Sequence, residues 1–297
     1  MQRWIFKSCL VFLSLVFSSS SFGANGGYPK IKEFLNQLVK TFPEKVKLVQ
    51  VGASDSGEII EGVAIGNGPV KNLVVATHHG NEYGSTEVAK AFANALAEQP
   101  ILGQTMYVIP VLNISGYNAN RRWEMVNGRY LDANRDYPGP CGTSGPFKLK
   151  STNSLAKFVE QENVVSSATL HTYYPAVVYP WGISSHDIST PHDGLFTQLV
   201  EAATVESHYQ TGNSTQVIYP ADGTFEDYAY WKHGIWSILF EVGYSHSPSE
   251  AAVKEMIRVN VPGLRRMFEQ APGQRADKHE FEGKCDSSLK SLDRHDE

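Results

Sequence analysis

The sequence predicts a single α/β domain, and three observations lead to this fold class. Helical and strand-like patterns alternate from residue 28 to residue 270, which is typical of a layered α/β protein. Apolar residues make up 41% of the chain and charged residues 19%, a balance that allows a large core. No internal repeat and no change in composition divides this region, so we expect one unit rather than two.

The spacing of apolar residues locates the expected elements. Ile31, Phe34, Leu35 and Leu38 recur at helical spacing and predict the first helix. Helices are predicted at residues 31–39, 85–98, 155–161, 194–206 and 225–232. Strands are predicted from β-branched and other apolar runs at residues 46–51, 59–65, 72–77, 105–112, 168–172 and 237–242.

A last helix is predicted to begin beside Ser247. Ser247 suits the N-cap, Pro248 suits the first helical position, and Glu250 completes a capping box. We expect this helix to reach Gln270, with a kink near Pro262 because proline removes a backbone hydrogen bond.

The first 23 residues have the pattern of a signal peptide. Arg3 and Lys7 flank an apolar run at residues 9–17 that is too short to span a bilayer. The small residues Ser21 and Gly23 predict cleavage after Gly23. We therefore expect export to the periplasm or the medium. No later stretch is long and apolar enough to predict a membrane helix.

Two of the three cysteines remain after removal of this signal, which contains Cys9. An oxidising compartment permits a disulfide between Cys141 and Cys285, although both can equally stay as free thiols. Residues 271–297 are polar and weakly patterned, so we expect a disordered tail unless Cys285 anchors it. The folded domain is therefore placed at residues 24–270.

A candidate metal site follows one of the predicted buried strands. His79 and Glu82 form an H-x-x-E pair at its end, and His171 ends another apolar run. Imidazole nitrogens and carboxylate oxygens are donors that zinc accepts, and three of them leave one position open. An isolated H-x-x-E pair is more often a solvated loop. Glu241, however, adds an acid in an apolar strand, where a charge is costly unless a partner or a metal lies nearby.

Five motifs in this order resemble the zinc metallocarboxypeptidase family, which includes carboxypeptidases A and B. The motifs are His79-x-x-Glu82, Asn134-Arg135, His171, Tyr219 and Glu241, and the likeness covers residues 28–270. The compact form is similar to bacterial members, among them murein peptide amidases. The resemblance implies a mixed, twisted β-sheet flanked by helices on both faces, and one Zn²⁺ per chain.

The resemblance also implies catalytic roles. The H-x-x-E pair and His171 are expected to bind zinc, which polarises the scissile carbonyl and lowers the pKa of water. Glu241 is expected to act as the general base. An arginine stabilises the oxyanion in the family. Arg122 is our candidate for this role, and the adjacent Arg121 is the alternative.

Four residues are expected to bind the substrate. Asn134 and Arg135 match the pair that binds the C-terminal carboxylate, for which a guanidinium is a bidentate partner. Tyr219 precedes Asp227 by the spacing of the tyrosine that closes over the substrate. Glu226 falls at the floor of the side-chain pocket, which predicts a basic or diaminopimelate-like side chain. Glu226 can also face outward from its helix.

The sequence thus predicts a monomeric zinc metallocarboxypeptidase that acts on peptides. The same residues allow a murein peptide amidase or endopeptidase that acts on peptidoglycan stem peptides. A non-catalytic peptide-binding module would require loss of a metal ligand or of the base, and all of them are present. The net charge of −5 and the absence of a basic stripe argue against a nucleic-acid-binding protein.

Overall fold

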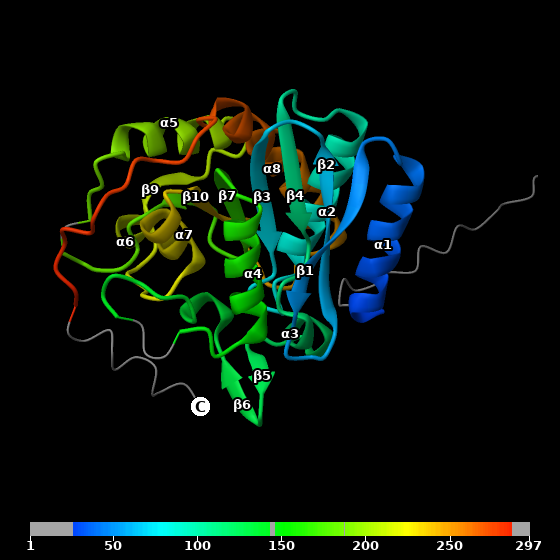
Figure 1. Cartoon of the computed structure of the whole chain (residues 1–297), viewed down its shortest axis with the longest axis horizontal. Coiled ribbons are helices and arrows are strands. Elements are labelled where there is room, and N and C mark those ends of the chain that lie inside the picture. The colour runs from blue at the N-terminus through cyan, green and yellow to red at the C-terminus, as the bar shows by residue number, and fades with distance from the viewer. Residues whose placement is uncertain (1–25, 143–145, 187, 287–297) are drawn as a thin grey trace, which may run out of the picture.

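The computed structural model describes residues 26–142, 146–186 and 188–286 (Figure 1). The predicted signal peptide at residues 1–23 lies outside these ranges. Eight strands form one sheet in the order β1-β2-β4-β3-β7-β10-β8-β9. Their bounds are β1 Val46–Ala53, β2 Ile59–Gly66, β3 Val70–Ala76, β4 Gln104–Ile109, β7 Ser166–His171, β8 Ala176–Tyr179, β9 Gln210–Asn213 and β10 Trp236–Glu241. A separate hairpin consists of β5 Glu124–Val126 and β6 Arg129–Leu131.

Helices cover both faces of the sheet. Figure 1 shows α4 and α7 in front of the strands and α2 and α8 behind them. The α-helices are α1 Gly27–Thr41, α2 Tyr83–Glu98, α3 Ile114–Ala119, α4 Lys150–Gln161, α5 Asp193–Ala203, α6 Ser214–Val217, α7 Phe225–His233 and α8 Glu250–Gln270. The predicted single-domain α/β fold, with a mixed sheet between helices, is confirmed.

Parallel pairing brings three strand ends to one edge of the sheet. Strand β7 lies between β3 and β10 and runs parallel to both. In this register Leu170 pairs with Ala76, and His171 pairs with Glu241. Because the carboxyl ends of parallel neighbours point the same way, the residues that end or follow these strands meet at one place.

The predicted start of the last helix is wrong by two residues. Helix α8 begins at Glu250, and its N-cap is Ser249, whose side chain accepts a hydrogen bond from the backbone N–H of Ala252. Ser247 instead donates its backbone N–H to the hydroxyl of Ser245, at 3.1 Å, and belongs to the preceding turn. The helix continues through Pro262 to Gln270.

The C-terminal segment is attached to the domain. Cys141 and Cys285, whose pairing the sequence left open, form a disulfide with a Cα–Cα distance of 5.5 Å. The described part of the segment, residues 271–286, follows α8 and ends at this disulfide. Within the described ranges, no helix combines the length and the hydropathy that crossing a membrane would need.

Candidate active site and metal centre

The H-x-x-E pair lies in a tight turn between β3 and α2. The turn begins at Thr77, which has a φ of 63° and whose hydroxyl donates to the carbonyl of Pro110. Gly80 follows, and a Cβ at this position would lie 2.0 Å from the carbonyl carbon of Gly116, so only glycine fits. Glu82 is the N-cap of α2. The turn therefore directs His79 and Glu82 towards the end of β7.

Three donor atoms from these elements converge on one point. The Nδ1 atom of His79 lies 2.8 Å from Oε1 of Glu82, and the Nδ1 atom of His171 lies 3.1 Å from Oε2 of the same carboxylate. The two Nδ1 atoms are 3.3 Å apart. Ligands at zinc bond lengths of about 2.0–2.2 Å in a tetrahedral arrangement are separated by roughly 3.3 Å. The residues present therefore fit a zinc ion, and in the described part of the chain they form the only such group.

The electrostatics of this group also favour a cation. Burial would raise the pKa of Glu82, but the attraction of His79 and His171 outweighs it and holds that pKa far below the usual range. Burial would lower the pKa of His171, but Glu82 raises it to about 9. The ionised carboxylate of Glu82 thus favours positive charge on the imidazole beside it, and a divalent cation bound between the same side chains would be stabilised in the same way.

Asp132 is a functional candidate that the sequence did not reveal. One of its oxygens lies 3.0 Å from Nε2 of His79, and the other accepts from the guanidinium of Arg122 at 2.8 Å. Burial alone would raise the pKa of Asp132, but the charges of His79 and the nearby arginines keep it well below its usual range. A carboxylate on the far nitrogen fixes the ring of a metal-binding histidine. The only sequence signal was an acid just before the Asn134-Arg135 pair.

The two neighbouring arginines, Arg121 and Arg122, lie in different surroundings. Arg122 lines the pocket, and its Nη1 lies 3.2 Å from Nδ1 of His79. Arg121 instead lies over the ring of Tyr130 on the hairpin, 5.4 Å from its centroid. Arg122 is therefore the one placed beside the metal ligands.

Glu241 ends β10 and lines the same pocket. Its Oε2 atom is buried and, within the described residues, accepts no hydrogen bond. Burial and repulsion from Glu82 raise the pKa of Glu241 to about 7, although His171 and His79 oppose the shift. An unpaired buried carboxylate with such a pKa is suited to proton transfer near neutral pH.

The pocket has a volume of about 510 Å³ and contains the remaining predicted residues. Asn134 and Arg135 lie in a short 3₁₀ turn, Ala133–Arg135, after the hairpin. The guanidinium of Arg135 donates to the hydroxyl of Tyr219 at 3.2 Å and lies 5.9 Å from the centre of its ring. Tyr219 is 53% exposed.

Glu226 faces the pocket rather than solvent. Its side chain is 4% exposed, and one of its carboxylate oxygens accepts a hydrogen bond from the hydroxyl of Thr169 on β7. The other oxygen is 3.5 Å from the amide nitrogen of Asn134. The amide oxygen of Asn134 also accepts a hydrogen bond from the backbone N–H of Phe225, at 2.9 Å. The acid is thus held beside the candidate carboxylate-binding pair, with acceptor capacity left for a ligand.

Known proteins share this architecture. The family model described as zinc carboxypeptidase matches residues 31–261. Carboxypeptidase B of Astacus astacus is 25% identical over 249 residues, which cover 70% of this chain and 82% of that protein. Zinc carboxypeptidase A 1 of Anopheles gambiae is 27% identical over 261 residues, covering 74% of this chain but only 59% of that protein.

A solved structure supports the same fold. Bovine thrombin-activatable fibrinolysis inhibitor, in complex with tick carboxypeptidase inhibitor, superposes with a TM-score of 0.75 and 15% identity. The superposition covers 81% of this chain and 95% of that one. The family match extends over most of the chain and includes the H-x-x-E turn, His171 and Glu241. The chain therefore belongs to the zinc carboxypeptidase family, whose members are zinc-dependent peptide hydrolases.

Proposed function

We propose that the chain hydrolyses the peptide bond next to a free C-terminal residue. The observation that carries this proposal is the content of a single pocket. It holds three donors for zinc, a carboxylate with an unpaired oxygen at Glu241, and a guanidinium at Arg135. Arg135 offers a bidentate partner to a terminal carboxylate, which distinguishes a chain end from an internal peptide bond.

The mechanism follows from the placement of these groups. Zinc, held by the two histidines and Glu82, would supply Lewis acidity for the scissile carbonyl and the attacking water. Glu241 would take the proton of that water on its free Oε2 atom and then deliver it to the leaving amine nitrogen. Arg122 would donate hydrogen bonds to the oxyanion as negative charge develops there.

Binding of the chain end would involve the turn that carries Asn134 and Arg135. The guanidinium of Arg135 would exchange its hydrogen bond with Tyr219 for two bonds to the substrate carboxylate. The freed tyrosine, which is exposed at the rim, would then cover the bound residue. Exclusion of water by this movement would strengthen every electrostatic contact inside the pocket.

Matched peptides test this proposal. We expect a peptide that ends in a free lysine to release lysine as the first product, identified by mass spectrometry. The same peptide with a C-terminal amide is expected to react at least about 100-fold more slowly, because Arg135 loses its charged partner. Equal rates for the two peptides, or internal cleavage of both, would contradict an exopeptidase.

The specificity proposal rests on Glu226. A carboxylate that lines a pocket attracts an ammonium or guanidinium group on the substrate side chain. We expect Glu226→Gln to lower kcat/KM for peptides ending in lysine or arginine about 10- to 100-fold. Glutamine keeps the acceptor for Thr169, so the fold of the pocket is retained.

Peptides ending in leucine are the control for this substitution, since they make no ion pair with Glu226. Their kcat/KM is expected to change by less than about threefold. An equal loss for lysine and leucine peptides would end the specificity proposal without affecting the proposed reaction.

Peptidoglycan stem peptides are a second candidate substrate class. Diaminopimelate carries both a carboxylate for Arg135 and an ammonium for Glu226, and both residues line the pocket. Preference for diaminopimelate peptides over lysine peptides in the same assay would favour this candidate. Export is also proposed: the pattern of residues 1–23 and the Cys141–Cys285 disulfide both suit an oxidising compartment.

A further inference from the structure

The segment at residues 271–286, which we call the C-terminal strap, follows α8. Arg275 fastens its first part, because its guanidinium donates to the carbonyls of Val164 and Val159 at 2.7 and 3.0 Å. The backbone N–H of Ala276 donates to the carbonyl of Gly234 at 2.7 Å. These bonds attach the strap near the ends of α4 and α7 and beside the start of β7, whereas the metal ligand His171 lies at the carboxyl end of β7.

The middle of the strap packs on aromatic rings that lead towards the pocket. His279 stacks on Tyr230 with ring centroids 4.0 Å apart. Phe281 makes an edge-to-face contact with Trp181 at 5.2 Å. Trp181 is almost fully buried and directly precedes Gly182, which lines the pocket. The strap therefore covers the segment that forms one wall of the pocket.

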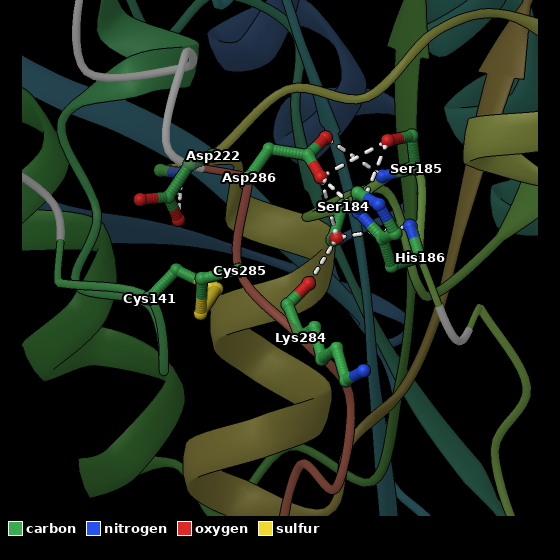
Figure 2. Close-up of a disulfide and its surroundings, with 9 residues drawn as sticks. Cys141, Ser184, Ser185, His186, Asp222, Lys284, Cys285 and Asp286 are labelled. Carbon is green, nitrogen blue, oxygen red and sulfur yellow. Dashed lines mark hydrogen bonds and ion pairs between the residues drawn. A yellow bond between two sulfur atoms is a disulfide. The ribbon is translucent and has the colours of Figure 1, made fainter.

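The end of the strap contacts two loops at once (Figure 2). Cys285 is bonded to Cys141, six positions after Arg135 in the chain. The next residue, Asp286, accepts hydrogen bonds from the backbone N–H and the hydroxyl of Ser185 at 2.8 and 3.0 Å. It also pairs with the imidazole of His186 at 2.5 Å. One dipeptide thus joins the loop after the carboxylate-binding pair to the loop after Gly182.

The wall formed by Gly182 leaves little room for displacement. Its backbone N–H donates to both oxygens of Asp227, and its carbonyl accepts from Ala221 at 2.5 Å. A Cβ on Gly182 would lie only 3.1 Å from the Cβ of Ser214. Ala221, Ser214 and Asp227 all line the pocket, so a shift of this wall changes the space that receives the substrate side chain.

We propose that the strap positions the two loops for substrate binding, through the disulfide and the carboxylate of Asp286. This inference rests on the proposed function of the pocket. Cys141, Cys285 and Asp286 are positioning residues, since they contact the loops and not the substrate. The disulfide also closes a chain segment with a sequence separation of 144 residues, so its loss lowers stability as well. Substrate affinity and stability must therefore be measured separately.

The test compares two strap variants with a matched control. The variants are the double substitution Cys141→Ser with Cys285→Ser, and the single substitution Asp286→Asn. We expect KM for a lysine-terminated peptide to rise about 5- to 20-fold, with kcat within about twofold and with unchanged zinc content. Asp286→Asn keeps the size of the side chain and provides the test if the cysteine variant does not fold.

Arg275→Ala is the control, because it loosens the first part of the strap and not the end that contacts the two loops. It is expected to lower the melting temperature and to leave KM unchanged. Unchanged KM in the folded strap variants, or equal loss of kcat/KM in Arg275→Ala, would overturn the inference. A chain that releases no C-terminal residue at all would refute the proposed function instead, which keeps the two failures distinct.

Discussion

Glu241→Gln is expected to lower kcat about 1,000-fold, with little change in KM and with zinc still bound. Glutamine has nearly the shape of glutamate but cannot accept a proton from water at neutral pH. Glu241 is partly buried at the end of β10, and its Oε2 atom is buried without a hydrogen-bond partner in the described residues. Steady-state kinetics on a lysine-terminated peptide, together with metal analysis, gives all three quantities.

Glu124→Gln is the matched control for this substitution. Glu124 is fully buried, and burial raises its pKa to about 7, as for Glu241, but it bonds to Ser151 and does not line the pocket. Its replacement is expected to leave kcat within about twofold of the value of the unaltered chain. A similar loss in both variants, or a loss below tenfold in Glu241→Gln, would show that the carboxylate of Glu241 is not the base.

The pH dependence of the unaltered chain follows from the same group. A general base works only when deprotonated, so kcat/KM falls as pH drops through the pKa of Glu241. Burial and Glu82 raise that pKa to about 7, and a bound divalent cation acts in the opposite direction. We therefore expect kcat/KM to begin to fall at a pH below 7, and we expect the residual activity of Glu241→Gln to show no such fall.

His171→Ala is expected to remove both zinc and activity, with a loss of at least about 10,000-fold in kcat/KM. It leaves one imidazole and one carboxylate, which is too few donors for a stable zinc site. His246→Ala is the control, because His246 lines the same pocket but is not one of the three converging donors. We expect that variant to retain zinc.

The sequence predicted the fold and the H-x-x-E pair well because their signals are local, whereas the family resemblance added His171, which is 92 positions from His79. Buried strands appear as apolar runs, and the H-x-x-E pair stands directly after one of them. The zinc cofactor is confirmed by the family match and by the grouping of His79, Glu82 and His171. The roles of individual residues in binding and catalysis stay predictions. The short strands β8 and β9 were not predicted, because four residues each are too few to show the alternation typical of a strand.

Other features depend on contacts between distant segments. Ser247 and Ser249 both fit an N-cap from local pattern alone, and only the fold around α8 selects Ser249. Asp132 gains its meaning from a histidine 53 positions away. The partner of Cys285 is 144 positions away. No periodicity in the sequence relates residues over such separations.

The zinc content of the unaltered chain and of His171→Ala, after dialysis against metal-free buffer and then against micromolar zinc, tests the convergence of the three ligands most directly. We predict one zinc per unaltered chain and none in the variant, while His246→Ala retains one. An unaltered chain that binds no zinc, or a His171→Ala chain that binds it as tightly, would contradict the site described above.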